Sequence, residues 1–363
     1  MAAAVVAAAE VAAAVVIDMY CTNKSRILLQ FHITGRCNLR CKHCYRTEGD
    51  VEALSYDDIV MIIEQFKTLR EHYNAINGIS RRGHINITGG EPFFRKDIKE
   101  ILRFLGENKE HFSYGILSNG SFIDDETIGL LKETEVSFVQ LSIDGDRETH
   151  DFLRADGDYD RVMKTAEWLE KNGIKTYISF TANKDNMYQL PLVAKECRKR
   201  KITKLWSDRL VPLGNGENLS EILIDRETIG EYIDCLKKAR GNVAVRSIFK
   251  KTQVTMNRAL QFQNSDGEIY SCSAGDTLIT VDEFGNIMPC RRMPVIRGNV
   301  FESTLTKVYF NDETFNMLRM KGIPAECKEC RYCGSCMGGA RCQSYALLKS
   351  FLKADPACPL IRK

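Results

Sequence analysis

Three cysteines lie within eight residues near the start of the chain: Cys37, Cys41 and Cys44, in the stretch CNLRCKHCY. Three thiols this close cannot pair among themselves without leaving one over. Thiolates favour soft metals, namely zinc or the iron of iron–sulfur clusters. Three ligands leave open one position of a tetrahedral zinc site, or one iron of a four-iron cluster. The spacing therefore predicts a metal centre with a vacant position.

A second group of cysteines lies toward the end of the chain. Of 14 cysteines in 363 residues, seven lie between residues 272 and 342, and Cys358 follows. Clustered CxxC spacings in a long chain rich in Lys and Glu indicate metal binding in a reducing, cytoplasmic compartment rather than a disulfide scaffold. Cys197 and Cys235 lie in helical patterns, so we expect buried structural thiols. The lone Cys21 is not expected to be a ligand.

The bulk composition is that of an ordinary globular protein, with 44% hydrophobic and 27% charged residues. With 51 basic and 48 acidic side chains, the net charge of +3 gives no argument for a nucleic-acid or membrane partner, and neither is expected. The run MAAAVVAAAEVAAAVV lacks the basic start of a signal peptide and is short for a membrane span. We treat residues 1–25 as an N-terminal extension, artefactual or poorly defined, outside the functional argument.

Strand-then-helix units begin at Arg26. Apolar residues recur at helical spacing over 55–73, and Ser55 is placed to cap that helix with Asp58 three residues on. Six units in sequence imply a parallel sheet with right-handed crossovers, too few to close an eight-stranded barrel. We expect strands at 27–34, 84–90, 114–120, 137–145, 174–182 and 202–214.

The predicted architecture is therefore an α/β fold. A partial (β/α)6 barrel is expected over residues 26–215, where the strand–helix rhythm holds. A bridging helical region follows over 216–260, and a small Cys-rich domain over 261–363. Because chemistry in such sheets gathers at the carboxyl ends of the strands, the motifs at these ends are the candidate site.

Four motifs fall at those strand ends. The cysteine loop follows the first strand, and Gly89-Gly90-Glu91-Pro92 follows the second. Ser118-Asn119-Gly120 follows the third, and Ser142-Ile143-Asp144 lies near the end of the fourth. Each has an ordinary interpretation as a strand-end turn or a helix cap. Their coincidence at one rim favours a ligand site.

The cysteine spacing, the aromatic ring of His43 before the last cysteine and the GGEP stretch together resemble the radical S-adenosylmethionine (radical SAM) enzymes over residues 26–215. The resemblance implies that Cys37, Cys41 and Cys44 hold a [4Fe–4S] cluster whose open iron binds the amino and carboxylate groups of S-adenosylmethionine. One electron would then cleave a carbon–sulfur bond and give a 5′-deoxyadenosyl radical that abstracts hydrogen from the substrate. A zinc site is the alternative.

The resemblance also assigns contacts with S-adenosylmethionine. Gly89, Gly90 and Glu91 match the strip that binds the amino group, since glycine lets backbone approach a ligand and Glu91 offers an acceptor for an ammonium. Ser142 and Asp144 resemble the polar residues that meet the ribose or the methionine end.

Three further residues are candidate contacts. Arg154, in HDFLR, resembles the arginine that pairs with the carboxylate, for which a planar fork is suited; an ordinary surface ion pair is the alternative. Ser118 and Asn119 either contact the ligand or cap the next helix.

The C-terminal stretches CSAGDTLITVDEFGNIMPCRR and CKECRYCGSCMGGARC are similar to the SPASM extension of radical enzymes, which carries auxiliary iron–sulfur clusters. The match is imperfect, because Cys342 comes six residues after Cys336 where the family has four. Two auxiliary clusters, of [4Fe–4S] type, are implied. The outer cysteine group would be Cys327, Cys330, Cys336 and Cys358, and the inner cysteine group, nearer the active site, Cys272, Cys290 and Cys342.

The inner cysteine group has no obvious fourth protein ligand. Either Cys333, which is extra to the family pattern, completes it, or one iron stays open to a substrate thiolate. A pair of zinc ribbons is the alternative to clusters. Auxiliary clusters suit an overall oxidation, because potentials of roughly −700 to +450 mV let them accept or deliver an electron.

Radical enzymes with this extension act mostly on peptides or proteins. In the sulfatase-maturing group an Asp follows the cysteine that corresponds to Cys290; here Arg291 and Arg292 follow it. Since arginine does not take up a proton near neutral pH, this argues against sulfatase maturation. The basic pair either attracts an acidic peptide or forms a solvated face.

We expect a peptide-modifying radical enzyme that installs a thioether or carbon–carbon cross-link in a ribosomal peptide. The alternatives are oxidation of a tetrapyrrole or other cofactor precursor, sulfatase-type Cys or Ser oxidation, and a non-catalytic zinc-binding module. Only about 25 residues precede the first strand, so a leader peptide would be held by another protein, by the core, or not be needed. Expected partners are the peptide and an electron donor such as flavodoxin or ferredoxin.

Overall fold

The computed structural model describes residues 25–46, 51–241, 252–263, 269–320 and 322–361. The expected N-terminal extension, with Cys21, lies outside the described residues except for Ser25, and so does part of the bridging region. In the described parts, no helix is both long and apolar enough to cross a lipid bilayer.

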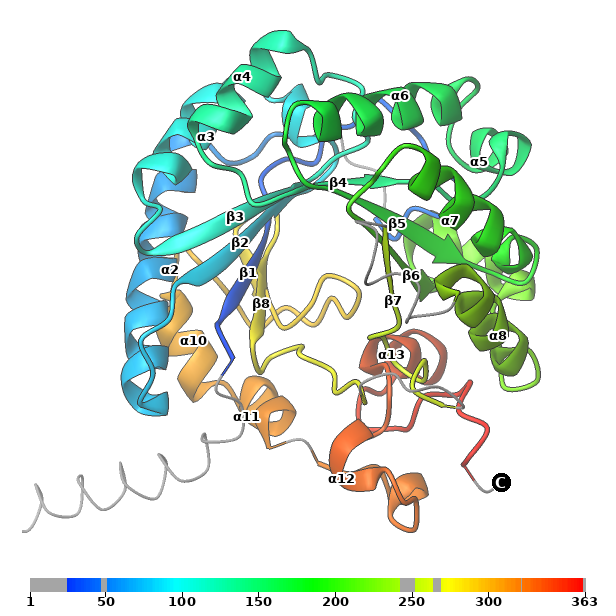
Figure 1. Cartoon of the computed structure of the whole chain (residues 1–363). Coiled ribbons are helices and arrows are strands. Elements are labelled where there is room, and N and C mark those ends of the chain that lie inside the picture. Colours follow the sequence, from blue (N-terminus) through cyan, green and yellow to red (C-terminus); the bar gives the residue numbers. More distant parts are fainter. Residues whose placement is uncertain (1–24, 47–50, 242–251, 264–268, 321, 362–363) are drawn as a thin grey trace, which may run out of the picture.

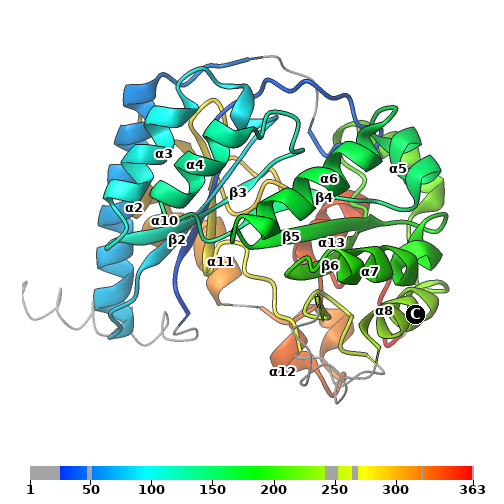
Figure 2. The ribbon, with the colours of Figure 1, turned by 45° about the horizontal axis from the view of Figure 1, so that its top comes forward.

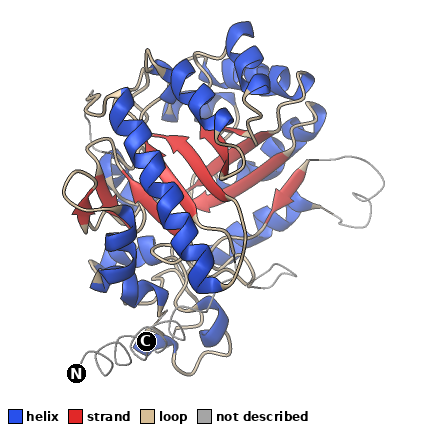
Figure 3. Ribbon diagram, turned by 90° about the vertical axis from the view of Figure 1, so that its left-hand side faces the viewer, coloured by secondary structure: helices blue, strands red, loops and turns tan. Residues whose placement is uncertain are grey.

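The predicted α/β fold is confirmed, and all six expected strands form in one parallel sheet that curves into an incomplete barrel (Figure 1). Each strand pairs with the next along the chain. Helices cover the outer, convex face of the sheet (Figures 1 and 3). The strands are β1 (Leu28–His32), β2 (Gly83–Thr88), β3 (Phe112–Leu117), β4 (Val139–Ser142), β5 (Thr176–Ala182) and β6 (Lys204–Arg209). The helices are α2 (Tyr56–Asn77), α3 (Ile98–Glu107), α4 (Asp125–Glu133), α5 (Arg147–Leu153), α6 (Asp158–Lys171), α7 (Leu190–Lys199) and α8 (Ile229–Arg240).

The sheet continues past both edges of this six-stranded unit. β7 (Gln253–Thr255) pairs in parallel with β6, and β8 (Leu278–Val281) pairs in parallel with β1. β9 (Asn286–Met288) and β10 (Gly298–Asn299) extend the β8 edge in antiparallel fashion. These strands were not predicted, because they are short and interrupt an irregular Cys-rich region. The domain bounds at 215 and 260 stay a prediction, and the sheet runs across them.

The helices of the C-terminal region, orange to red in Figures 1 and 2, lie at the open side of the barrel, between the β8 side of the sheet and its β7 edge. Part of this region packs into the main core, since Leu305, Tyr309 and Phe315 belong to the same hydrophobic cluster as the strands. The C-terminal helices are α10 (Leu305–Asn311), α11 (Glu313–Arg319), α12 (Cys333–Cys336) and α13 (Arg341–Leu348).

Side chains at alternate positions of the strands point to opposite faces of the sheet, into the core under the helices or into the barrel interior. On β1, Leu29 and Phe31 are fully buried, whereas Leu28 and Gln30 line the interior. The capping box predicted for α2 is present, because Asp58 N donates to Ser55 Oγ (3.2 Å) and Ser55 N donates to Asp58 Oδ2 (2.9 Å). Helices held in this way keep the carboxyl ends of the strands at one rim.

Candidate active site

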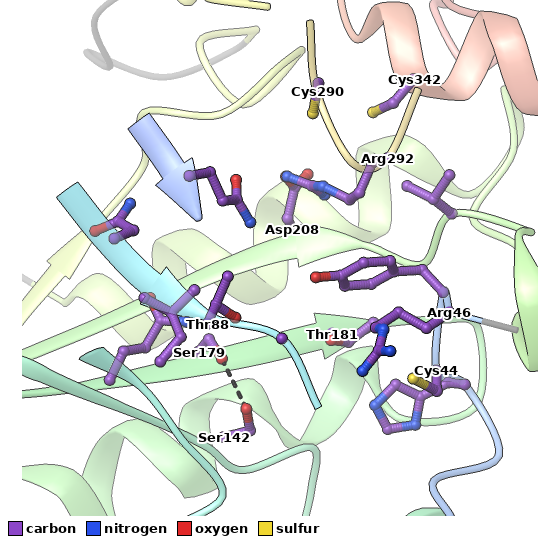
Figure 4. Close-up of a pocket in the computed structure, with 18 of the residues that line it drawn as sticks. Cys44, Arg46, Thr88, Ser142, Ser179, Thr181, Asp208, Cys290, Arg292 and Cys342 are labelled. Atoms are coloured by element: carbon purple, nitrogen blue, oxygen red, sulfur yellow. Dashed lines mark hydrogen bonds and ion pairs between the residues drawn. The ribbon is translucent and has the colours of Figure 1, made fainter. Parts of the chain in front are cut away.

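A cavity of about 540 Å³ occupies the interior of the incomplete barrel (Figure 4). The fold brings two groups of cysteines to its wall. β1 leads directly into the loop that carries the first cysteine group, and the segment after β9 carries Cys290. The lining thiols are those of Cys37, Cys41 and Cys44 from the first group, and of Cys272, Cys290 and Cys342 from the inner group.

Uncharged polar side chains cover the strand wall between the two cysteine groups. Ser142 Oγ and Ser179 Oγ are 3.1 Å apart (Figure 4), and Trp206 Nε1 donates to Gln140 Oε1 at 3.1 Å. A barrel interior filled by apolar side chains would be a packed core, whereas this one is hollow and can accept hydrogen bonds from a ligand. The set comprises Gln30, Asn86, Thr88, Gln140, Ser142, Ser179 and Thr181.

Hydrogen-bond donors surround the first cysteine group. Arg154 Nη1 lies 3.8 Å from Cys41 Sγ, and Asn119 Nδ2 lies 3.9 Å from Cys37 Sγ. Burial nevertheless raises the pKa of Cys41 to about 11, and the nearby Arg154 only partly opposes this. The free thiol is therefore protonated at neutral pH, and a metal must displace the proton on binding.

Gly89 and Gly90 line the cavity and also fix the cysteine loop. Gly90 N donates to Thr34 O, and Glu91 N donates to Arg36 O, both at 2.8 Å. A Cβ on Gly89 would lie 2.3 Å from Thr34 O, and one on Gly90 only 2.0 Å from Arg36 O. Gly89 also has φ +140°, a conformation that side chains rarely adopt. The glycine pair is thus required by the backbone that begins the cysteine loop.

Glu91, which was predicted to meet the amino group of the ligand, lies behind the cavity wall. Its side chain is fully buried, and its carboxylate accepts hydrogen bonds from Phe93 N (3.1 Å), Ser118 Oγ (2.8 Å) and Asn119 N (2.6 Å). Burial raises its pKa to about 7, and the hydrogen bonds from Asn119, Ser118 and Phe93 oppose that rise. Glu91 thus holds the end of β3, where Ser118 and Asn119 line the cavity.

Asp144, which was predicted to contact the ligand, also lies behind the cavity wall. It is fully buried outside the cavity wall, where its Oδ2 accepts from Arg154 Nε at 2.6 Å and its Oδ1 accepts from Thr181 N at 2.8 Å. His43 Nε2 lies 3.3 Å from the same carboxylate. Despite opposition from burial, Arg154 and His43 hold the pKa of Asp144 at about 2. Asp144 therefore orients Arg154, which does line the cavity; Arg154 is not a surface ion pair.

The basic pair after Cys290 is divided between two environments. Arg291 is neither solvated nor in the cavity, since it pairs with Asp282 (3.2 Å) and Glu283 (3.4 Å). Glu283 also accepts from Arg46 Nη2 at 2.7 Å, so this buried network joins the first cysteine loop to the segment of the inner cysteine group. Arg292 lines the cavity and donates to Asp208 (Figure 4).

The outer cysteine group lines a second, small pocket away from the first. Cys333 lies there too, beside Cys330 and Cys336, and not beside the inner group. Cys333 is therefore not placed to act as the fourth ligand of the inner group. The other prediction for that group, an iron left open to a substrate thiolate, stays a prediction. The other two cysteines behave as expected: Cys197 and Cys235 are buried in the core.

Sequence reasoning missed several residues of the cavity wall, chiefly Trp206, Asp208, Arg258 and Tyr270. Trp206 and Asp208 occupy alternate positions of β6, which is the signal that could have revealed them. Arg258 and Tyr270 come from irregular segments, and no local pattern marks them.

Comparisons with known proteins agree with this geometry. The model of the Radical SAM superfamily matches residues 31–196, and the model of the SPASM family, an iron–sulfur cluster-binding domain, matches residues 272–336. These spans contain the first cysteine group and most of the C-terminal cysteines. Each set of thiols lines a cavity, and thiolates are the ligands of iron–sulfur clusters, so the residues present fit such cofactors.

Individual relatives span nearly the whole chain. The Fe-coproporphyrin III synthase of Methanosarcina barkeri is 26% identical over 92% of this chain and 88% of its own. The mycofactocin maturase MftC of Mycolicibacterium smegmatis is also 26% identical, over 92% of this chain and 82% of its own. Streptococcus suis SuiB, solved with S-adenosylmethionine, shares the fold with a TM-score of 0.72 at 20% identity, over 94% of this chain and 79% of its own.

The matches to the two families also identify the cofactors. They are a [4Fe–4S] cluster that works with S-adenosylmethionine and the auxiliary iron–sulfur clusters of the C-terminal region. The zinc-binding module is therefore set aside. The chain is a radical SAM enzyme and belongs to the branch of that superfamily with a C-terminal SPASM domain.

Proposed function

We propose that this enzyme oxidatively modifies a ribosomal peptide, by a thioether or carbon–carbon cross-link, inside the cavity between its two lining cysteine groups. Cys37, Cys41 and Cys44 would hold the cluster that, with S-adenosylmethionine, supplies hydrogen-abstracting radical chemistry. The two auxiliary clusters would be held by the inner and the outer cysteine groups. The target residue would lie between the first and the inner group.

The uncharged polar wall of the cavity is the observation that carries the peptide assignment. Amide and hydroxyl groups of Gln30, Asn86 and Gln140 and of the neighbouring Ser and Thr residues match the donors and acceptors of a peptide backbone. An apolar macrocycle against this wall would leave polar groups without partners, which costs free energy. In the solved structures, SuiB, which shares this fold, has also been seen bound to its precursor peptide SuiA.

The residues around the first cysteine group would bind and orient S-adenosylmethionine. Arg154, held by Asp144, directs its remaining guanidinium nitrogens to the cysteine loop and would pair with a carboxylate. Asp144 and Glu91 would act as positioning residues behind the wall. The direct contacts would come from Gly89, Gly90, Ser118, Asn119, Ser142 and Arg154, all of which line the cavity.

Oxidation of a tetrapyrrole is the second candidate function, favoured by the arginines of the cavity. Its described lining includes seven arginines and a single carboxylate, that of Asp208. Three of these arginines pair with carboxylates behind the wall, and the remaining positive charge suits a substrate with carboxylate groups. The relatives that span most of the chain include proteins named Fe-coproporphyrin III synthase and AdoMet-dependent heme synthase.

One experiment separates the two candidates. The enzyme, reconstituted with iron and sulfide without oxygen, is reduced and supplied with either a short peptide encoded beside its gene or Fe-coproporphyrin III. We expect 5′-deoxyadenosine to accumulate with the peptide, which should lose two hydrogens by mass spectrometry. An unchanged peptide together with a consumed tetrapyrrole would replace the first function by the second.

A further inference from the structure

Three cationic side chains lie along one face of β6: Lys204 of the strand itself, and Arg258 and Arg292, which contact the strand from other segments. Lys204, Trp206 and Asp208 share this face, and the residues between them are buried against the core. Lys204 Nζ lies 4.4 Å from the centre of the Tyr177 ring, and the guanidinium carbon of Arg258 lies 4.4 Å from the centre of the Trp206 ring. Alternate residues of a strand are about 6.6 Å apart, so the cations occupy successive steps along β6.

At the next step, Arg292 binds Asp208. Its Nη1 and Nη2 both lie 2.9 Å from Asp208 Oδ2, beside Cys290 and Cys342 (Figure 4). Although burial opposes the change, Arg292, Arg258 and Arg209 together hold the pKa of Asp208 below its usual range. Asp208 is therefore a carboxylate flanked by more than one guanidinium.

Within the described residues, the charges at this part of the cavity are not all paired. Arg46, Arg154 and Arg209 also line the cavity, and each pairs with a buried carboxylate: Glu283, Asp144 and Asp355. Arg258, by contrast, lines the cavity and forms no direct ion pair with a carboxylate of the described residues, although the charge of Asp208 lies nearby. A guanidinium in a cavity wall without an ion-pair partner suits a ligand that brings the acceptor.

We propose that Arg258 and Arg292 together bind a carboxylate of the substrate and hold it beside the inner cysteine group. The inference rests on the proposed peptide function and makes it more specific: the substrate carries an Asp or Glu side chain next to the modified residue. Guanidinium groups bind carboxylates through paired hydrogen bonds, and the Trp206 ring stabilises Arg258 by a cation–π contact.

The charge count defines the class of ligand further. In the part of the chain that the structure describes, Asp208 already neutralises one of the two guanidinium groups and leaves the charge of the other to be matched. A monovalent carboxylate satisfies it, whereas a dianionic phosphate would be repelled by Asp208. The carboxylate of S-adenosylmethionine has a separate partner in Arg154, which lies at the first cysteine group.

The test compares two small probes that differ only in charge. N-acetyl-glutamate N-methylamide and its glutamine counterpart are titrated calorimetrically into the reconstituted enzyme with S-adenosylmethionine present. We expect the unaltered enzyme to bind the glutamate probe about ten-fold or more tightly than the glutamine probe. Arg258→Gln should lose most of this preference. Equal binding of the two probes by the unaltered enzyme would overturn the proposal.

Two further variants make the result specific. Lys204→Gln removes a cation that is likewise stacked on an aromatic ring of this face but does not line the cavity, so it should keep the preference. Asp208→Asn removes the competing carboxylate and should strengthen binding of the glutamate probe, an effect that a purely structural role of the pair would not produce. Loss of the preference in Lys204→Gln to the same extent as in Arg258→Gln would contradict the site.

Binding is measured without turnover, so its outcome is separate from that of the proposed function. A carboxylate preference that depends on Arg258 supports the site even if no peptide product forms. Modification of a peptide without such a preference keeps the function and removes the site. Arg258-dependent binding of Fe-coproporphyrin III, with no discrimination between the probes, would reject the acidic side chain as the ligand.

Discussion

The two cysteine groups that line the cavity are built in opposite ways. The first comes from one short loop after β1, so Cys37, Cys41 and Cys44 are neighbours in sequence as well as in space. The inner group is assembled from three distant segments, which the pairing of β8 with β1 and the packing of the C-terminal helices bring together. The loop needs only the neighbouring turn at Gly89 and Gly90 to shape it, whereas the assembled site depends on segments from the whole C-terminal region.

Substitution of single cysteines should give the largest difference between the first and the inner cysteine group. We expect Cys41→Ala to abolish cleavage of S-adenosylmethionine, because the first cluster would lose one of three protein ligands. Cys272→Ala should retain substrate-independent cleavage but give no oxidised product. Cys333→Ala, which alters a residue of the outer pocket beyond the predicted ligands, serves as the control. Iron content and 5′-deoxyadenosine yield distinguish these cases, and equal losses in all three would contradict the division of roles.

Gly90→Ala should damage the first cysteine loop nearly as much as removal of a ligand. The new Cβ would lie 2.0 Å from Arg36 O, a backbone atom that can move only with the loop. We expect a loss of stability of about 1–3 kcal/mol and a much larger loss of iron from the first cluster. Chemical denaturation and electron paramagnetic resonance measure the two effects.

Gly129→Ala is the matched control for that substitution. Gly129 lies within α4, where a Cβ would meet nothing within 4 Å. A glycine-to-alanine change inside a helix should stabilise the protein by roughly 0.5–1 kcal/mol. Unaltered iron binding in Gly90→Ala would show that the close approach to Arg36 can relax.

Glu283→Gln tests the link between the two regions. The carboxylate joins Arg46 of the first loop to Arg291 beside Cys290, and all three side chains are largely buried. Removing one partner of a buried ion pair costs about 3 kcal/mol, which denaturant unfolding would reveal. Glu126→Gln, in an exposed pair with Lys99, should cost less than about 1 kcal/mol. Comparable small costs for both variants would mean that the network does not couple the regions.

The dependence of stability on pH should distinguish Glu91, which lies behind the first cysteine group, from Asp208, which lies beside the inner cysteine group. Burial raises the pKa of Glu91 to about 7, above its usual 4.5, so the folded state binds a proton that the unfolded state releases. The contribution of the protonated Glu91 side chain to the free energy of unfolding is fully present at low pH. It should be lost as the pH rises from about 4.5 through 7. Asp208, whose pKa is lowered, stays ionised over that interval.

The measurement is the free energy of unfolding as a function of pH. The slope between pH 4.5 and 7 should become shallower in Glu91→Gln, whatever the absolute stability of that variant. Asp208→Asn should leave the slope unchanged. An identical slope in Glu91→Gln and the unaltered enzyme would assign the titration to other groups.

Structural features that depend on residues close together in the sequence could be predicted from the sequence. The first six strands, the cap of α2 at Ser55 and the grouping of the first cysteines follow from spacing within a few residues. The role of Glu91 was not readable, because its burial depends on three hydrogen bonds from another strand end and from its own turn. Likewise the ion pair of Asp208 with Arg292 joins residues 84 apart along the chain, which no periodicity reveals.

The pairing of β8 with β1 also has a consequence for the order in which the parts of the fold can form during synthesis. Leu28 lies opposite Leu278, so one edge of the first strand is covered only after three quarters of the chain has been synthesised. Contacts between such distant segments form late in folding. The loop of the first cysteine group is therefore synthesised early, whereas the wall of the cavity that β8 and the inner cysteine group supply is complete only when translation is nearly over.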